Sequence, residues 1–387
     1  MDEIPHIHFT RQEFAQRKER VLRELAAARL DGLLIFRQES MYWLTGYDTF
    51  GYVFFQCLYL GADGRLMLLT RAPDLLQAKH TSVIGDIRIW VDGPDAQPAT
   101  ELREILRSFG CTGRKLGVEY EAYGLTARNG MRLNAALDGF CRLEDASDLV
   151  SRLRVVKSPA EIAYVHKAAE LADLALDEAH RLAGPGAFEG DIIAAMQGAV
   201  FRGGGDDPAN EYIIGSGADA LLFRYFTGRR TLDARDQLTL EFAGTYRHYH
   251  ACLMRTIPIG EPLPGQREMH KVSVDALEAC KEALKPGRPI GEVFDAYARV
   301  CDAAGHRAHR LNATGYSLGT TFAPNWMDWP MFYHGNPEPA APGMVFFIHI
   351  LILDSGRGLA MTTGQTVLVT ETGNEVLSRR PLDLVVK

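Results

Sequence analysis

Two strand-like segments follow each other closely in the middle of the chain, QLTLEFAG (237–244) and YHACLMRTIPI (249–259). In the first segment, apolar residues at every second position form one face, so Glu241 is expected to point to the other face. In the second, side-chain direction repeats every two residues, which places His250 and Cys252 on the same side. A hairpin of these two strands would bring a carboxylate, an imidazole and a thiol together. Such a set can bind a metal, transfer protons or simply pack.

The first part of the chain alternates helical and strand-like stretches. Residues 12–32 form an amphipathic pattern typical of a helix, and residues 32–37 follow as a short apolar strand. Residues 52–70 contain two strand-like runs joined by an Asp-Gly turn, the pattern of a hairpin. We therefore expect an N-terminal α/β domain over residues 1–150.

A second domain is expected over residues 151–387. Ser158 is a suitable N-cap, Pro159 suits the first helical position, and Glu161 completes a capping box. Apolar residues then recur at helical spacing, and a glycine-rich break follows the helical region. The central hairpin comes next, followed by two helical patterns at 267–284 and 290–305 and two strand patterns at 344–353 and 364–371.

The composition excludes some classes of function. The chain has 387 residues and a formal net charge of -7, and this acidic balance argues against a nucleic-acid partner. No apolar run approaches the roughly 20 residues that span a bilayer, and MDEIPHIHFT lacks the features of a signal peptide. The six cysteines are scattered without a CxxC motif, so we expect reduced thiols in a cytoplasmic protein.

Several stretches, in this order, resemble the creatinase/aminopeptidase family. In the second domain they are RLRVVKSPAEI (152–162), IIGSGADALLFRY (213–225), LEFAGTYRHYHACLMRT (240–256), PGMVFFIHI (342–350) and GQTVLVTETGNEVLS (364–378). MYWLTGY (41–47) resembles a segment of the family's N-terminal domain. The resemblance implies an α/β (α+β) protein in which an N-terminal creatinase-like α/β domain precedes a catalytic domain of the pita-bread fold.

The resemblance also locates the positions that hold metal in this family. Metal-dependent members bind two ions through two aspartates, a histidine and two glutamates, and these positions fall on Glu241, Cys252, Tyr316, His349 and Gly364. That set cannot provide a carboxylate-rich site for two ions. A single zinc held by Glu241, Cys252 and His349 is chemically possible and stays open as an alternative. We predict no metal and no other cofactor, with Gly364 leaving room where the last ligand stood.

Relatives without metal are creatinases and ectoine hydrolases, which cleave C–N bonds of small zwitterions. TGYSLGTTFAPNW (314–326) is more similar to the ectoine hydrolase branch. Creatinases depend on a histidine at the position of Arg224, which argues against creatine as the substrate. The resemblance thus implies a metal-independent hydrolase of a carboxylate-bearing amidine, guanidine or amide.

Individual roles follow from this reading, each beside a structural alternative. Glu241 would be the nucleophile or the general base, although it could be an ordinary solvated strand residue. His250 or His349 would protonate the leaving nitrogen, although the first could be a surface histidine and the second a hydrogen-bonded core histidine. The residues expected to contact substrate are Arg224 and Arg255 as clamps for its carboxylate, Tyr316 and Trp326 as walls, and Cys252 as a small filler. Arg255 is more often a structural residue in the family, so Arg224 is the preferred clamp, and the aromatic residues could be core.

Two other functions remain open, a metal-dependent Xaa-Pro dipeptidase or aminopeptidase and a non-catalytic ligand-binding member of the fold. The expected partners are a small zwitterionic substrate and a second copy of the chain. In relatives the N-terminal domain of one subunit overhangs the other's site, and WLTGYDTFGY (43–52) offers aromatic residues for such a lid. We interpret His248 and His334 as surface residues.

Overall fold

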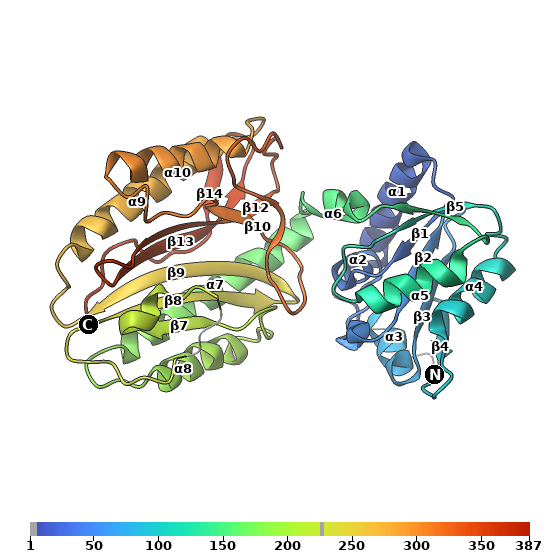
Figure 1. Cartoon of the computed structure of the whole chain (residues 1–387), viewed down its shortest axis with the longest axis horizontal. Helices are drawn as coiled ribbons and strands as arrows, with labels where there is room; N and C mark the ends of the chain where they lie inside the picture. The colour runs from blue at the N-terminus through green and yellow to red at the C-terminus, as the bar shows by residue number, and fades with distance from the viewer. Residues whose placement is uncertain (1–5, 225–227) are drawn as a thin grey trace. The chain divides into compact units, whose positions relative to one another are not determined.

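The computed structural model describes residues 6–224 and 228–387, and the chain divides into two compact units, Met1–Arg154 and Val155–Lys387 (Figure 1). Each unit has its own β-sheet. In the part of the chain that the structure describes, no helix combines the length and the apolar character needed to cross a bilayer.

The N-terminal unit is a six-stranded sheet in the order β4-β3-β2-β1-β5-β6. Its strands are β1 (Gly32–Ile35), β2 (Cys57–Gly61), β3 (Leu66–Arg71), β4 (Asp86–Trp90), β5 (Lys115–Val118) and β6 (Arg142–Asp145). Its helices are α1 (Arg11–Ala28), α2 (Gln38–Thr45), α3 (Leu75–Thr81), α4 (Pro98–Ser108), α5 (Ala127–Leu137) and α6 (Asp148–Arg154). The expected hairpin is present, because β2 and β3 pair antiparallel. Separate apolar cores on the two faces of the sheet, one with α4 and α5 and one with α1 and α2, show that helices cover both faces.

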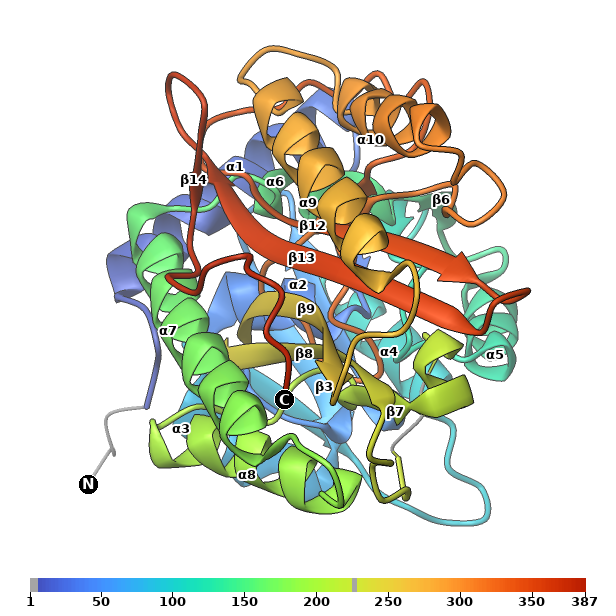
Figure 2. The same cartoon turned by 90° about the vertical axis from the view of Figure 1, so that its left-hand side faces the viewer.

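The C-terminal unit is built on an eight-stranded sheet in the order β11-β10-β12-β13-β9-β8-β7, with β14 paired to β13. Its strands are β7 (Ile213–Ser216), β8 (Asp236–Tyr246), β9 (Tyr249–Ile259), β10 (Gly315–Ser317), β11 (Asp328–Met331), β12 (Val345–Asp354), β13 (Leu359–Val369) and β14 (Asn374–Val376). Its helices are α7 (Pro159–Leu182), α8 (Glu189–Arg202), α9 (Gln266–Ala283) and α10 (Gly291–Ala303). Figure 2 shows α7 and α9 lying across the same side of β8, β9 and β13, which we call the helix face.

Local sequence signals explain how the central hairpin is held. The predicted capping box is formed, with the Ser158 side chain and Glu161 at the start of α7. Glu161 also accepts a hydrogen bond of 2.7 Å from the Tyr249 hydroxyl at the first residue of β9. Between β8 and β9, Arg247 and His248 have φ values of 51° and 65°. A two-residue hairpin turn of type I′ needs positive φ at both positions, so this sequence forms the turn without the usual glycine.

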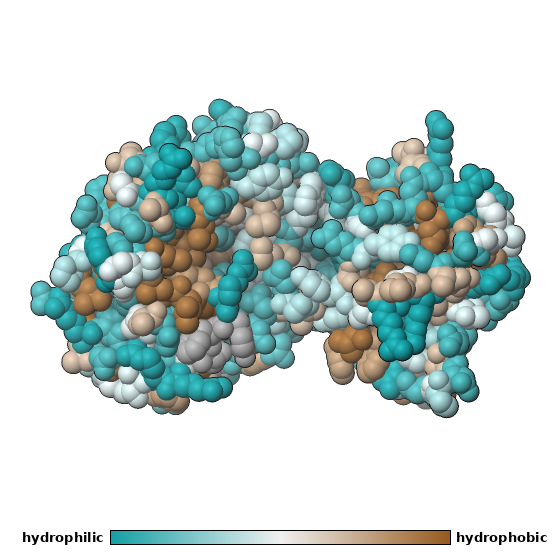
Figure 3. Space-filling view, in the orientation of Figure 1, coloured by the Kyte–Doolittle hydropathy of each residue, from teal (hydrophilic) through white to brown (hydrophobic). Residues whose placement is uncertain are grey.

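The segment predicted as a lid is mostly interior. Trp43, Tyr47 and Tyr52 are buried, whereas Phe50 is 78% exposed. The prediction is therefore wrong for three of the aromatic residues, which belong to the N-terminal unit's own packing. Figure 3 shows apolar patches among hydrophilic residues on the visible surface of each unit.

Candidate functional site

The strand register brings the positions of interest onto one side of the sheet. Glu241 pairs with Met254, Met254 with Gly364, and Gly364 with His349, so these residues form one row across β8, β9, β13 and β12. Directly paired residues point to the same side. We call this side the Glu241 face; it is opposite the helix face.

A neighbouring row contains the other positions. Cys252 pairs with Ala243, and Phe347 pairs with both Thr366 and Tyr316. Tyr316, Phe347 and His349 also form an aromatic group, with ring centroids 5.3 to 5.7 Å apart. The five positions that the family resemblance assigned to metal ligands are thus neighbours in two adjacent rows.

Glu241 lies within a short chain of hydrogen bonds. The Tyr316 hydroxyl donates to Glu241 Oε1 at 3.3 Å, and Trp326 Nε1 donates to the Tyr316 hydroxyl oxygen at 2.8 Å. Burial raises the pKa of Glu241 from 4.5 to about 7, while the Tyr316 hydrogen bond and the charge of Arg224 act to lower it. Burial also raises the pKa of Tyr316 well above its usual value, so the phenol stays protonated and donates a hydrogen bond to Glu241. Glu241 can therefore exchange a proton near neutral pH.

His349 is half-buried beside these residues. Its Nδ1 atom is buried and has no hydrogen-bond partner within residues 6–224 and 228–387. Burial lowers the pKa of His349 to about 4, and the charge of Arg224 acts in the same direction. The imidazole is therefore neutral at pH 7, with one ring nitrogen unused by the protein's described residues.

His250 is engaged at both ring nitrogens and fully buried. Its Nε2 accepts a hydrogen bond from the Ala209 backbone N–H at 2.9 Å, and its Nδ1 lies 3.1 Å from Thr321 Oγ1. Burial lowers the pKa of His250 to about 3. The arrangement does not favour the predicted role of His250 as a proton donor to substrate, because neither nitrogen is available.

The two arginines have different surroundings. Arg255 pairs with Leu240 and Thr363 on the helix face, and its guanidinium donates to the Met254 and Gly364 carbonyl oxygens at 2.8 and 2.9 Å. The prediction that Arg255 contacts substrate is therefore wrong, because alternation along β9 turns its side chain away from the Glu241 face. Arg224 is exposed, and its charge acts on both Glu241 and His349. Tyr225, which ends the predicted glycine loop, lies outside the described residues.

The residues do not fit a two-metal centre. A Cβ atom added at Gly364 would lie 2.7 Å from Phe347 Cε2 and 2.9 Å from Met254 Cβ, so a carboxylate side chain has no space there. The expectation of empty room at Gly364 is wrong, because the Phe347 ring fills it. Cys252 is fully buried, and burial raises the pKa of its thiol well above the usual value. Across the described ranges, no group of three or more His, Cys, Asp or Glu side chains is placed to hold a metal ion. Glu241, Cys252 and His349, the set considered for a single zinc, are therefore not placed to bind one.

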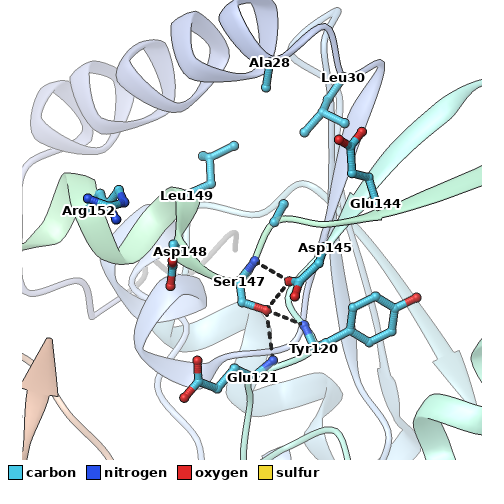
Figure 4. Close-up of a pocket in the computed structure, with 11 residues that line it drawn as sticks. Ala28, Leu30, Tyr120, Glu121, Glu144, Asp145, Ser147, Asp148, Leu149 and Arg152 are labelled. Carbon is cyan, nitrogen blue, oxygen red and sulfur yellow. Dashed lines mark hydrogen bonds between the residues drawn. The ribbon is translucent and has the colours of Figure 1, made fainter.

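A separate cavity of about 710 Å³ lies within the N-terminal unit (Figure 4). Its lining includes Glu121, Glu144, Asp145 and Asp148. The Ser147 hydroxyl donates to Asp145 at 2.5 Å and accepts hydrogen bonds from two backbone N–H groups. These bonds stabilise the turn after β6, which gives Ser147 and Asp145 a structural role.

Comparison with known proteins gives consistent family matches. Residues 163–371 match the model of "Metallopeptidase family M24", and residues 17–156 match "Creatinase/Prolidase N-terminal domain". The ectoine hydrolase of Halomonas elongata is 28% identical over 398 residues, covering 98% of each chain. The Xaa-Pro dipeptidase of Pyrococcus furiosus is 26% identical over 238 residues, covering 62% of this chain and 67% of the relative. The crystal structure of dipeptidase PepE from Mycobacterium ulcerans has a TM-score of 0.84 at 26% identity and covers 98% of this chain and 99% of its own. The chain therefore belongs to metallopeptidase family M24, a hydrolase family, with a creatinase-like N-terminal domain before a pita-bread domain, as the sequence resemblance predicted.

Proposed function

We propose that this protein is a metal-independent hydrolase of a C–N bond in a small carboxylate-bearing amidine, guanidine or amide, with the cyclic amidine ectoine as the first candidate. The observation that carries the proposal is the buried Glu241 carboxyl, bonded to Tyr316 and with a pKa of about 7. The similarity to the ectoine hydrolase of Halomonas elongata over nearly the whole chain supports the same choice.

In this mechanism Glu241 acts as a general base. A general base is most effective when its pKa lies near the working pH, and the raised pKa of Glu241 meets that condition. The same raised pKa is less suited to a carboxylate nucleophile, which must be ionised to attack. Glu241 removes a proton from water while the water oxygen bonds to the amidine carbon. The C–N bond then breaks as the departing nitrogen takes that proton back from Glu241, giving an amide and an amine.

The neighbouring residues bind and orient the substrate. Arg224 forms a bidentate pair with the substrate carboxylate, and the neutral His349 uses its Nδ1, which no described residue binds, for a polar substrate atom. Tyr316 holds the Glu241 carboxyl, Trp326 holds the Tyr316 hydroxyl, and the two rings form a wall of the site. Cys252 fills space without taking part in the reaction, which agrees with the raised pKa of its thiol.

Peptidase activity has less support. Relatives named Xaa-Pro dipeptidase share the fold, but three of the positions that the family resemblance assigns to metal ligands hold Cys252, Tyr316 and Gly364. The Phe347 ring also fills the space beside Gly364. The proposed mechanism therefore uses no metal ion. A binding protein without activity is the other competing hypothesis, and it is tested by whether the wild-type protein binds ectoine without hydrolysing it.

The test replaces Glu241 by glutamine. Glu241→Gln keeps the shape but removes the base, so turnover of ectoine, followed by NMR, should fall by roughly 10²-fold to 10⁴-fold. Glu375→Gln makes the same change at an exposed residue of β14 and should leave turnover unchanged. Near-normal turnover in Glu241→Gln would contradict the mechanism. Wild-type protein that binds ectoine without hydrolysing it would favour the binding hypothesis, and metal-dependent cleavage of Xaa-Pro dipeptides would favour the peptidase.

A further inference from the structure

Two loops that are far apart in sequence meet at the His250 side chain. One is the segment between α8 and β7, which contributes the Ala209 backbone N–H to His250 Nε2. The other is the segment between β10 and β11, which contributes the Thr321 hydroxyl to His250 Nδ1. His250 itself is fixed in β9, where its backbone N–H donates to the Gly319 carbonyl oxygen at 3.3 Å. One imidazole thus connects both loops to the central hairpin.

The hydrogen bonds determine the protonation state of this imidazole. A backbone N–H can only donate, so His250 Nε2 must be the unprotonated acceptor. The neutral ring then carries its proton on Nδ1 and donates it to Thr321 Oγ1. Both nitrogens of the fully buried His250 ring are thus hydrogen-bonded. Only a side chain with an acceptor facing Ala209 and a donor facing Thr321 can make the same two bonds.

The same two loops are joined again at Trp326, whose ring binds Tyr316, the hydrogen-bond partner of Glu241. Asn210, next to Ala209, accepts a hydrogen bond of 3.2 Å from the Trp326 backbone N–H through its side-chain oxygen. Trp326 lies five residues beyond Thr321, and its Nε1 donates to the Tyr316 hydroxyl, which donates to Glu241. A continuous path of contacts therefore runs from His250 through the two loops to the carboxyl.

We propose that His250 is a positioning residue that sets the placement of Trp326 and Tyr316 against Glu241 by fastening residues 209–210 and 321–326 to β9. The proposal rests on the proposed function, because it assigns His250 an effect on the reaction that Glu241 carries out. His250 touches no reacting atom in this scheme. It acts through the Trp326–Tyr316–Glu241 hydrogen bonds.

Several charged and titratable groups surround this path. Around Glu241 they are Tyr316 on β10, His349 on β12, Cys252 on β9 and Arg224 after β7. Near His250 the corresponding group is His248, whose backbone N–H donates to Asp206 at 3.3 Å. His248, predicted as a surface residue, is half-buried, and its ring stacks on Phe322 at 4.1 Å. The variants below leave all these groups unchanged except where Tyr316 is replaced on purpose.

The experiment compares two substitutions of the full-length protein. His250→Gln keeps an acceptor for the Ala209 N–H and a donor for Thr321, whereas His250→Leu keeps neither. Tyr316→Phe serves as the reference, because loss of its hydrogen bond removes an influence that lowers the pKa of Glu241. The readout is the midpoint of the acid limb of kcat/KM for ectoine, which reports the free enzyme's base.

The expected results separate positioning from simple destabilisation. Tyr316→Phe should move the acid midpoint to higher pH by roughly one to two units, the size expected for one lost hydrogen bond to a charged group. His250→Leu should move it in the same direction and lower kcat by roughly tenfold to a hundredfold. His250→Gln should stay close to wild type. His306→Leu, a change at another buried histidine in the same unit, should lower the melting temperature without moving the midpoint.

Two different failures can be told apart. If Tyr316→Phe moves the midpoint but His250→Leu only lowers the melting temperature, the positioning role is overturned and the proposed function stands. If Glu241→Gln remains fully active, the proposed function fails instead. Should ectoine not be hydrolysed, the pKa of Glu241 in each variant can be read by carbon-13 NMR of labelled glutamate carboxyls, with Glu241→Gln providing the assignment. An unchanged pKa in His250→Leu would then reject the positioning role directly.

Discussion

We predict that the ionisation of Glu241 makes the free energy of unfolding depend on pH. The substitution Glu241→Gln should remove this dependence. The pKa of Glu241 in the folded protein is about 7, against an ordinary value of 4.5. Because the folded protein holds this proton more tightly than the unfolded chain does, protonation favours folding. The contribution is fully present below pH 4.5 and is lost as the pH rises through about 7. At about 1.36 kcal/mol for each pKa unit, the total loss is about 3 kcal/mol.

The assay measures the free energy of unfolding of wild type and Glu241→Gln from below pH 4.5 to above pH 7. Groups that titrate in both proteins cancel in the difference, which isolates Glu241. Urea unfolding combined with hydrogen exchange of β8 peptides assigns the transition to the unit that contains the site. The wild type should lose stability relative to the variant across this range and level off above pH 7. A difference that stays constant with pH would refute the reasoning, since Glu241 would then have an ordinary pKa.

Three further predictions concern substrate, metal and assembly. Arg224→Lys should raise KM for ectoine roughly tenfold with a smaller effect on kcat, because one ammonium group does not reproduce a planar bidentate donor; an unchanged KM would remove Arg224 from the site. Protein purified without added metal should contain less than a stoichiometric amount of transition metal by mass spectrometry, and chelators should leave hydrolysis intact; one tightly held zinc, lost together with activity, would count against the proposed mechanism. Light scattering at micromolar concentration should give the mass of a homodimer, the commonest closed assembly, and a stable monomer would contradict the expectation.

Much of the fold was accessible from sequence where local chemistry determines local structure. The Ser158 capping box starts α7 where predicted, and the strand expected over 249–259 has those bounds in β9. Alternation along β8 alone also predicts that the side chains of Glu241 and Leu240 lie on opposite faces of the sheet. The same rule could have excluded Arg255, because an odd separation from Cys252 within one strand turns the two side chains to opposite faces.

The rest depended on contacts between segments that are distant in sequence. Nothing in the spacing of His250 indicates that the Ala209 backbone N–H approaches one nitrogen and Thr321 the other. Likewise, Phe347 reads as one apolar residue in an apolar run, and only the pairing of β12 with β13 brings its ring over Gly364. Asn210 and Thr321 were missed for the same reason, since side chains that bind backbone groups of another loop leave no periodic signal.

The packing of Phe347 on Gly364 has a consequence for how the protein can evolve. A glutamate introduced at position 364 would have to displace a fully buried ring, so this single change should destabilise the protein before it creates a ligand. A smaller residue at position 347 would have to come first, and that change alone would leave a cavity and confer no metal binding. Each first step towards a metal ligand at position 364 is therefore harmful by itself. We expect Gly364 and Phe347 to be kept together or replaced together.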